Sequence, residues 1–542
     1  MCGIVGYVGK ENAASILIEG LSKLEYRGYD SAGIAVLDNS RDKKEIEIIK
    51  AKGRLQALRE MTDNGKAVKG YCGIGHTRWA THGEPSVINA HPHVSKDKKI
   101  AVVHNGIIEN YKEIKEYLQK KGYEFVSQTD TEVIAHLLDY YYKGNCLEAI
   151  TKVLGRVRGS YALGILFQEN PGVMYAVRKD SPLIVGKSPQ GNLIASDVPA
   201  ILKYTKTVCY IDDREIAEIK ADGIRFYDID QEELQKEFKT VEWYAKAAEK
   251  EGFEHFMLKE IYEQPKAVAD TISPRIKNGK IVIDELEMTD EDIKKVSRIQ
   301  MVACGSAYHV CVCAKYVLEK LAKIPVDVDL ASEFRYRNPL MTEDTIITPE
   351  DLVIVVSQSG ETADSLAALR ESKKKGYKVL GIVNVVGSSI AREADSVFYT
   401  WAGPEISVAT TKAYSTQLAA VYLIGLLFGK VRGTIKDKEY REYIHELGTL
   451  PEKIQKILDE KERIQWLANK YSHTKDVFFI GRGLDYAISL EGSLKLKEIS
   501  YIHSEAYAAG ELKHGTISLI EEGVLVVGAA TQPDLFEKEV SN

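Results

Sequence analysis

Met1-Cys2-Gly3-Ile4-Val5-Gly6-Tyr7-Val8 opens the chain and predicts a buried strand with a reactive residue at its start. β-Branched and aromatic residues favour the strand. If Met1 is removed, Cys2 carries a thiol, nucleophilic as the thiolate, and an α-amine that can accept a proton near neutral pH. One residue then supplies both nucleophile and general base. The alternative is that Cys2 is a core residue, because free cysteine is among the most buried residue types.

The composition is that of a multidomain globular protein. The 542 residues exceed what one core holds, and three to four domains are expected. The formal charge of −7, with no long basic run, does not indicate a nucleic-acid partner. No apolar run reaches the roughly 18 residues of a membrane span, and no signal peptide is indicated. Seven irregularly spaced cysteines are not a disulfide framework, so we expect a reducing, cytoplasmic location.

The first 240 residues predict an α+β domain. Apolar residues at three- and four-residue spacing indicate helices at 13–26, 110–121 and 131–142. Most predicted strands follow one another without a helix between them, which favours antiparallel sheets in a sandwich. The strands are expected at residues 4–8, 31–37, 46–50, 100–103, 161–166, 173–178, 193–196 and 216–220.

Polar clusters separate these elements, and we expect them in loops. Five histidines between His76 and His104 could suggest zinc, but none has the i, i+4 spacing of helical metal ligands. Asn105-Gly106 also fits a hairpin turn, and Thr129 or Asp130 fits a helix cap.

A thiolate that attacks an amide needs three partners. An asparagine amide beside a main-chain N–H can form an oxyanion hole, an arginine can bind a carboxylate, and an aspartate can bind an ammonium group. Asn105-Gly106, Arg78 and Asp130 have these types and lie in separate segments.

From residue 291 the pattern becomes α/β, after a charged linker and a connecting helix at 241–290. Strands alternate with helices, which predicts a parallel sheet wrapped by helices. The predicted strands are 299–303, 326–329, 352–356, 378–383 and 396–399, and the helices begin near 305 and span 362–375 and 415–428.

The loop Ser357-Gln358-Ser359-Gly360-Glu361-Thr362 joins a strand to a helix in this region. Its hydroxyls and exposed N–H groups at a helix start predict a phosphate cradle. It lacks the lysine of a Walker loop, and helix capping by Ser359 or Thr362 is the alternative. A second such loop, Cys304-Gly305-Ser306, could add donors. Cys304, Cys311, Cys313 and His309 do not complete a tetrahedral metal set, so we interpret the cysteines as core residues.

An internal repeat follows. Gly305 aligns with Gly483, Tyr308 with Tyr486 and Glu333 with Glu511, which predicts a duplicated α/β domain. The second copy has a strand at 477–480, a helix at 486–499 and a strand at 523–528, after which only residues 529–542 remain. We therefore expect the second copy to be incomplete.

Five motifs, in this order, are similar to the glutamine amidotransferase domain of the N-terminal-nucleophile class: Met1-Cys2-Gly3-Ile4-Val5-Gly6, Glu25-Tyr26-Arg27-Gly28-Tyr29-Asp30-Ser31-Ala32-Gly33, His76-Thr77-Arg78-Trp79-Ala80-Thr81-His82-Gly83, His104-Asn105-Gly106 and Thr129-Asp130-Thr131-Glu132. The resemblance implies that Cys2 forms a γ-glutamyl thioester and that Asn105 and Gly106 form the oxyanion hole. It implies a glutamine site made of Arg78 (carboxylate clamp), Asp130 (α-amine clamp), Trp79 (gate of an ammonia channel) and the supporting residues Thr81, His82 and Arg27.

The second half resembles the two sugar-isomerase (SIS) domains of the glutamine–fructose-6-phosphate aminotransferase (isomerising) family. The first SIS domain matches through residues 357–362 and 405–412, and the second through 491–499 and 508–515. The resemblance implies that Glu498 moves a proton between sugar carbons C1 and C2, that Lys495 assists, and that His514 opens the ring from a neighbouring subunit. It implies sugar-phosphate contacts from Ser306, Ser357, Gln358, Ser359, Thr362 and Val408.

This resemblance implies an enzyme that makes glucosamine 6-phosphate and glutamate from fructose 6-phosphate and glutamine, the first step of hexosamine (UDP-GlcNAc) biosynthesis. It implies a homodimer without metal or organic cofactor, and without nucleic-acid or membrane partners. The expected plan is an amidotransferase domain at 1–240, a linker and helix at 241–290, SIS domain 1 at 291–436 and a truncated SIS domain 2 at 468–542.

Two departures from the family pattern leave alternatives open. Ala307 stands where the family usually has serine, and no residue matches the imine-forming lysine of the family's C-terminal tail. A glutaminase-only fragment, another N-terminal-cysteine amidotransferase (phosphoribosyl-transferring or asparagine-forming) and a non-catalytic SIS sensor are the alternatives.

Overall fold

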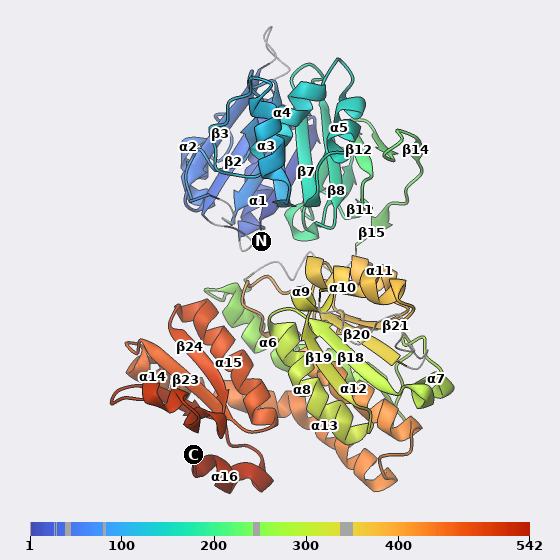
Figure 1. The fold of residues 1–542 in the computed structure, drawn as a ribbon, viewed down its shortest axis with the longest axis vertical. Coiled ribbons are helices and arrows are strands. Elements are labelled where there is room, and N and C mark those ends of the chain that lie inside the picture. Colours follow the sequence, from blue (N-terminus) through green and yellow to red (C-terminus); the bar gives the residue numbers. More distant parts are fainter. Residues whose placement is uncertain are drawn as a thin grey trace. The chain divides into compact units, whose positions relative to one another are not determined.

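The computed structural model describes residues 2–25, 28, 30–37, 45–79, 83–241, 250–336 and 351–542. The chain forms two compact units, Met1–Glu249 and Lys250–Asn542. Each unit has its own sheets and cores, and each is described separately (Figure 1).

Unit 1 contains two antiparallel sheets, as predicted. The first has the strand order β15 (Lys239–Thr240), β11 (Thr207–Tyr210), β9 (Ile184–Ser188), β10 (Gly191–Ala195), β1 (Gly3–Gly9), β4 (Cys72–Arg78), β2 (Ser31–Leu37), β3 (Ile46–Lys52). The second has the order β14 (Glu233–Leu234), β13 (Ile224–Tyr227), β12 (Ile216–Lys220), β8 (Val173–Lys179), β7 (Gly159–Phe167), β6 (Ile100–Ile108), β5 (His93–Val94).

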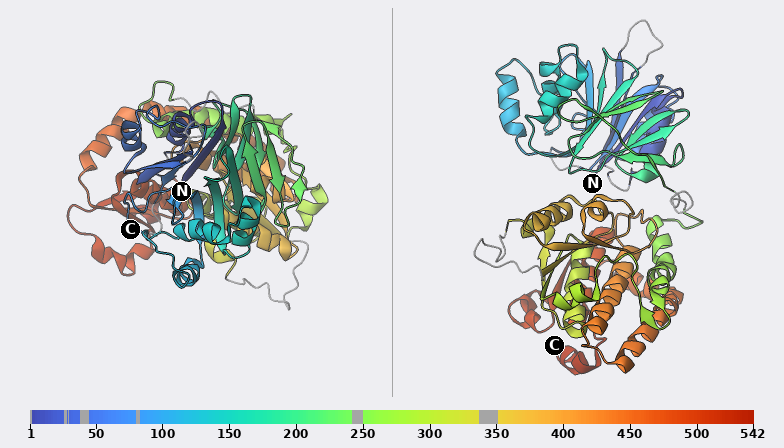
Figure 2. Two further views of the ribbon diagram at one scale, coloured as in Figure 1. Left: turned by 90° about the horizontal axis from the view of Figure 1, so that it is seen from above. Right: turned by 90° about the vertical axis from the view of Figure 1, so that its right-hand side faces the viewer.

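The two sheets pack face to face, with helices on their outer faces. One core joins the sheets, a second lies under α1 (Ala13–Ser22) and α2 (Leu55–Met61), and a third lies under α3 (Tyr111–Gln119), α4 (Glu132–Tyr141) and α5 (Cys146–Leu154). The cyan helices outside the sheets are visible in the right-hand view of Figure 2.

Strand β1 is buried on both faces. Because side chains alternate along a strand, Ile4 and Val8 enter the core between the sheets, while Val5 and Tyr7 pack under the helices. Gly6 faces the second sheet, where an added Cβ would lie 2.4 Å from Met174 Sδ. The opening stretch of sequence is therefore the centre of the sandwich.

Three local predictions in unit 1 are wrong. Strand β4 includes residues 76–78, and β6 continues through Asn105 and Gly106, so neither segment is a loop or a hairpin turn. Thr131 holds the N-cap position of α4 and makes no capping bond, so neither Thr129 nor Asp130 caps the helix. Polar residues and glycines were interpreted as loop signals, but pairing with flanking strands overrides local propensity.

Unit 2 begins with a parallel sheet in the order β19 (Val326–Leu330), β18 (Arg298–Ala303), β20 (Asp351–Ser357), β21 (Lys378–Val383), β22 (Ser396–Tyr399). Helices cover both faces. One face packs against α6 (Phe256–Ile272), α8 (Ser306–Leu321), α12 (Lys412–Val431) and α13 (Asp437–Asp459), and the other against α9 (Ala331–Phe334), α10 (Ala363–Lys374) and α11 (Ser389–Glu393).

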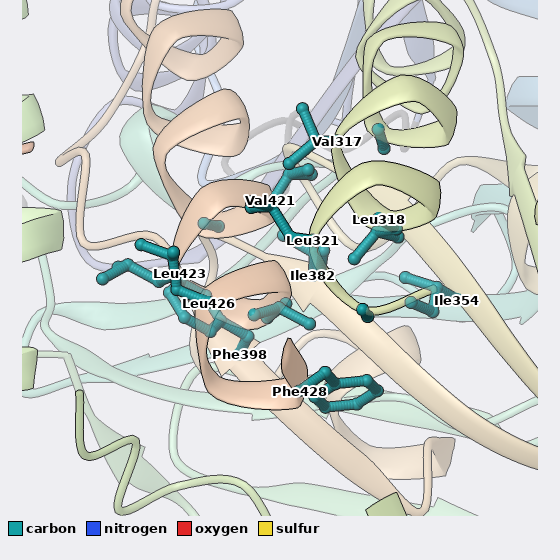
Figure 3. Packing of buried hydrophobic residues seen from close by; sticks show 14 of the residues in the cluster. Val317, Leu318, Leu321, Ile354, Ile382, Phe398, Val421, Leu423, Leu426 and Phe428 are labelled. Atoms are coloured by element: carbon teal, nitrogen blue, oxygen red, sulfur yellow. The ribbon is translucent and has the colours of Figure 1, made fainter. Parts of the chain in front are cut away.

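Leucine, valine and phenylalanine side chains of α8 and α12 interdigitate over the sheet residues Ile354, Ile382 and Phe398 (Figure 3). Helix α12 is long and apolar enough to cross a membrane by length and composition, although 61% of its most apolar window is buried inside the fold. That burial is typical of a core helix. The remaining elements of this part are α7 (Asp290–Lys295), β16 (Ile276–Lys277), β17 (Lys280–Ile281) and α14 (Lys461–Tyr471).

The predicted repeat is present in the structure. A second parallel sheet has the order β24 (His503–Ala508), β23 (Asp476–Gly481), β25 (Leu525–Gly528), which repeats β19-β18-β20. Helix α15 (Leu484–Ser500) corresponds to α8, and α16 (Phe536–Val540) corresponds to the start of α10. Gly305 and Gly483 precede the paired helices with the same backbone shape, φ 57° and ψ −132° against φ 57° and ψ −122°. Only glycine adopts that conformation readily.

A buried charged cluster ties α6 to the loop before α12. The Glu260 carboxylate accepts hydrogen bonds from the main-chain N–H groups of Ile406 and Ser407. Lys412 Nζ lies 2.6 Å from the Glu263 carboxylate. Burial, and next the neighbouring Glu405, raise the pKa of Glu260 to about 7.

We predict that substituting Gly6→Ala destabilises unit 1 by about 1–3 kcal/mol, because the methyl group would have to enter a filled space between the sheets. Urea unfolding measures the change. Gly223→Ala is the control, since nothing lies within 4 Å of a Cβ built there. Equal stability of the Gly6→Ala variant and the parent would show that the sheets can separate at this point.

We predict that Glu260 makes unit 2 less stable as the pH rises from about 4.5 to about 7. Its carboxyl is protonated in the folded state over this range and ionised in the unfolded state, so the folded state binds the extra proton and loses stability as protons become scarce. Glu260→Gln should reduce the loss of unfolding free energy between pH 5 and pH 8 by on the order of 3 kcal/mol. The exposed Glu287→Gln change should not.

Candidate functional site

The first candidate site lies where the two sheets of unit 1 meet at one end. Cys2 directly precedes β1, and Gly3 pairs with Thr77 beside Arg78, the last residue of β4. Asn105 comes from β6 of the other sheet, and its side-chain Nδ2 donates to the Cys2 carbonyl oxygen at 3.0 Å. The predicted nucleophile and the predicted oxyanion-hole residue are therefore brought together from different sheets.

The Cys2 sulfur accepts a hydrogen bond from the Trp79 main-chain N–H at 3.2 Å. Burial raises the pKa of the Cys2 thiol above its usual range, although this N–H lowers it. A thiol of raised pKa needs a base close to it, and after removal of Met1 the α-amine of Cys2 itself would serve. Trp79 is 41% exposed.

Arg78 and Asp130 are buried near the sheet ends. The Arg78 guanidinium donates to the Gly83 carbonyl at 3.0 Å and lies 3.8 Å from the Asp30 carboxylate. Asp130 Oδ2 accepts from the Ile108 main-chain N–H at 2.8 Å, which anchors it to β6. Arg27, Thr81 and His82 lie outside the described residues.

Gly106 can be only glycine in this strand. Its φ is +126°, and an added Cβ would lie 2.1 Å from the Ser160 carbonyl oxygen of β7. Gly106 thus has a backbone conformation that residues with a side chain rarely adopt.

A cluster of buried histidines lies next to Asn105, and sequence reasoning interpreted this cluster least well. His76 Nε2 lies 3.0 Å from Asn105 Oδ1, while His91 and His104 both bond the Thr131 hydroxyl, at 2.9 and 2.8 Å. Burial lowers the pKa of His76 to about 3, and the pKa values of His91 and His93 far below their usual range, so these rings are neutral. The described residues contain no group of three or more side chains arranged to hold a metal ion.

The second candidate site lies at the carboxyl end of the parallel sheet in unit 2. Strand β18 has β19 on one side and β20 on the other. The connections that leave β18 and β19 therefore lead to opposite edges of the sheet, and the topological switch point lies between β18 and β20. Ligands bind at such switch points in open α/β sheets. Ser306 begins α8 after β18, and residues 357–362 follow β20.

The loop after β20 is shaped by its own hydrogen bonds. Ser357 Oγ accepts from the Gly360 main-chain N–H at 3.1 Å and contacts Thr362 Oγ1 at 3.0 Å, while Ser359 Oγ accepts from the Glu361 N–H. Gly360 has φ +64° and would place a Cβ 2.0 Å from Ser388 Oγ. Gln358 Oε1 is buried and makes no hydrogen bond within the described chain. Val408 lies in the loop before α12 and is 55% exposed.

Helix α15 carries Lys495 and Glu498, two of the three remaining predicted residues. Lys495 Nζ makes a short ion pair with Glu498 and lies 3.4 Å from Glu491 Oε1. Glu491 Oε2 in turn bonds His309 Nδ1 of α8 at 2.8 Å. No sequence signal linked His309 to Glu491, because they are 182 positions apart and only the packing of α8 on α15 joins them. His514 is exposed at the end of the short helix Glu511–Lys513.

In the second copy, a side chain of the chain itself is bonded at the corresponding switch point. Ile299 pairs with Leu352 in the first sheet, and Val477 pairs with Leu525 in the second, so residues 530–535 of the second copy are equivalent to the loop 357–362 of the first. There the buried Asp485 carboxylate accepts from the Thr531 N–H at 2.8 Å and from its hydroxyl at 2.5 Å. In the second copy, a carboxylate of the chain itself is therefore bonded to the loop at this position.

Comparisons with known proteins agree with this geometry. A glutamine amidotransferase domain model matches residues 33–242, and a SIS domain model matches residues 292–427 and 470–540. The glutamine–fructose-6-phosphate aminotransferases (isomerizing) of Caldanaerobacter subterraneus and Clostridium acetobutylicum are 59% and 57% identical to the chain over 100% of its length and 88% of theirs.

Among solved structures, the C-terminal domain of glucosamine-fructose-6-phosphate aminotransferase from Francisella tularensis is 41% identical, with a TM-score of 0.51, and the match covers 54% of this chain and 80% of that one. The matches to relatives extend over the whole length of the chain and include both kinds of domain. The chain therefore belongs to the glutamine–fructose-6-phosphate aminotransferase (isomerizing) family.

Proposed function

We propose that the chain converts fructose 6-phosphate and glutamine into glucosamine 6-phosphate and glutamate. The observation that carries the proposal is the Asn105 amide directed at residue 2, in a chain that also holds a hydroxyl-rich loop at the switch point of a parallel sheet. Family membership supports the same reaction and does not favour another N-terminal-cysteine amidotransferase.

At the first site, the Cys2 thiolate attacks the side-chain amide carbon of glutamine. The Asn105 Nδ2 and the Gly106 N–H would stabilise the oxygen that becomes negatively charged. Ammonia leaves, and water hydrolyses the resulting thioester to glutamate. Arg78 would bind the substrate carboxylate and Asp130 its ammonium group, with Trp79 as the gate for ammonia and Arg27, Thr81 and His82 in support.

At the second site, the hydroxyls of Ser357, Ser359 and Thr362, with Gln358, Ser306 and the Val408 main chain, would bind the sugar phosphate. Glu498 would move a proton between C1 and C2, and the ion pair with Lys495 keeps that carboxylate beside a cation that can assist. Ammonia adds to the sugar carbonyl and water leaves. His514 would open the sugar ring.

The exposed position of His514 supports its donation to a neighbouring subunit, and we propose a homodimer on this basis. We further propose the domain boundaries 1–240, 241–290, 291–436 and 468–542, a cytoplasmic location, and a reaction that uses no metal or organic cofactor. The proposed partners are the two small-molecule substrates and a second copy of the chain.

The proposal is tested by incubating the chain with glutamine, with and without fructose 6-phosphate, and measuring glutamate and glucosamine 6-phosphate. Both products support it. Glutamate without amino sugar would restrict this chain to glutaminase activity, and the absence of both would refute the catalytic assignment.

We predict that Cys2→Ala lowers glutamate release by at least about 10³-fold, because it removes the thiol proposed to form the thioester. The assay is glutamate formation after intact mass has established whether Met1 is present. Cys146→Ala, a change in the core of the same unit, should retain most activity. Glutamate formation at the parent rate by the Cys2→Ala protein would refute the nucleophile assignment.

We predict that Gly360→Ala weakens fructose 6-phosphate binding at least about tenfold. The loop must move to admit the Cβ, and each charge-assisted hydrogen bond to phosphate that is lost is worth about 1.5–3 kcal/mol. Calorimetry measures the Kd. Gly448→Ala, where a Cβ meets nothing within 4 Å, should bind like the parent. Unchanged binding by Gly360→Ala would place the phosphate elsewhere.

A further inference from the structure

His76 is a buried, titratable side chain that the reaction just described does not use. It lies on β4, where Cys72 and Ile74 face the core between the two sheets. Because side chains alternate along a strand, His76 faces the same way, and its ring reaches β6 of the opposite sheet. The ring is fully buried and packs against His91 with ring centroids 4.1 Å apart.

The tautomer of His76 follows from its neighbours. Its Nε2 lies 3.0 Å from the main-chain carbonyl oxygen of His104 and 3.0 Å from Asn105 Oδ1. A carbonyl oxygen can only accept a hydrogen bond, so Nε2 carries the hydrogen and donates it. Nδ1 is buried and makes no hydrogen bond within the described residues, so nothing there favours the other tautomer.

The same reasoning fixes the Asn105 amide. One end of the amide faces the Nε2–H donor of His76 and must be the oxygen. The other end lies 3.0 Å from the Cys2 carbonyl oxygen, which also only accepts, and must be the NH₂ group. Two independent carbonyl groups, of His104 and of Cys2, therefore require one orientation of the amide. In the flipped orientation an oxygen would face the Cys2 carbonyl and an NH₂ would face the ring N–H.

We propose that His76 is a positioning residue for glutamine hydrolysis, which holds the Asn105 amide with its NH₂ on the Cys2 side, where it can donate to the oxyanion that forms when the Cys2 thiolate attacks glutamine. This inference rests on the proposed glutaminase function. The ring remains neutral over the physiological pH range, so the Nε2–H is present at every pH at which the thiolate forms. A protonated ring would also donate from Nε2, but it would place an unpaired charge in the core.

The test compares three variants of the full chain. His76→Leu fills the buried space with an apolar side chain and removes the donor. His76→Gln restores an N–H close to the position of Nε2. His91→Leu is the matched control, because this histidine belongs to the same buried cluster and bonds Thr131 rather than Asn105. Removing an oxyanion-hole donor lowers kcat by about 10²–10³-fold, so we expect His76→Leu to lower glutaminase kcat by about 10²-fold with the KM for glutamine within about threefold. The kcat of His76→Gln should be at least about tenfold higher than that of His76→Leu, and the kcat of His91→Leu should lie within about threefold of the parent value.

Alkylation of Cys2 by iodoacetamide supplies the second readout. This reaction displaces iodide from a saturated carbon and forms no oxyanion, so its rate should be the same in His76→Leu as in the parent. Equal losses of alkylation and hydrolysis, or equal losses in His76→Leu and His91→Leu, would show that the cluster merely supports the fold and would overturn the inference. A His76→Leu protein with the parent kcat would also overturn it. Failure of the parent itself to release glutamate would refute the proposed function instead, and the parent's alkylation rate would show whether Cys2 is reactive.

Discussion

The burial of β1 on both faces is the constraint on which unit 1 depends. Val5 and Tyr7 bind the strand to the helices on one side, and Ile4 and Val8 bind it to the second sheet on the other. A strand held in this way cannot shift by one residue without reversing every side chain. Residue 2 is therefore delivered to a defined point at the end of the sandwich, where β6 supplies Asn105 and Gly106. Chain ends are normally the most mobile part of a protein, and here the core packing of residues 4–8 holds the proposed nucleophile in place.

Unit 2 is built from two copies of one α/β arrangement. Both copies begin with strand, glycine turn and helix, and the glycines Gly305 and Gly483 share one backbone conformation. The copies then differ in what their equivalent positions hold. The first copy keeps a loop of hydroxyl groups, while the second contributes Lys495 and Glu498 from α15 and anchors this helix to α8 through Glu491 and His309. The residues proposed to bind the phosphate and those proposed to transfer the proton thus come from separate copies that pack through equivalent helices.

Sequence reasoning succeeded where a feature depends on neighbouring residues. The strand, loop and helix around residues 357–362 are local, and their bounds were predicted to within a residue or two. Reasoning from pattern failed where strand pairing decides the structure. His76 and Asn105 lie in strands because β1, β2 and β7 flank them, yet their own residue types suggested loops and turns. The contact between His309 and Glu491 had no local signal at all. The motifs identified the residues of the candidate site, but the reason for their orientation lies in contacts across the sheets.

The bond between Asp485 and Thr531 has a consequence for stoichiometry. A carboxylate tethered to the chain competes with a dissolved anion as an intramolecular partner, and here it already accepts hydrogen bonds from the N–H and the hydroxyl of Thr531. A dissolved anion would have to displace this carboxylate before it could bind the Thr531 N–H. With the sugar-phosphate site proposed above, we expect one sugar phosphate to bind per chain, so the duplicated fold need not give cooperative binding within one molecule.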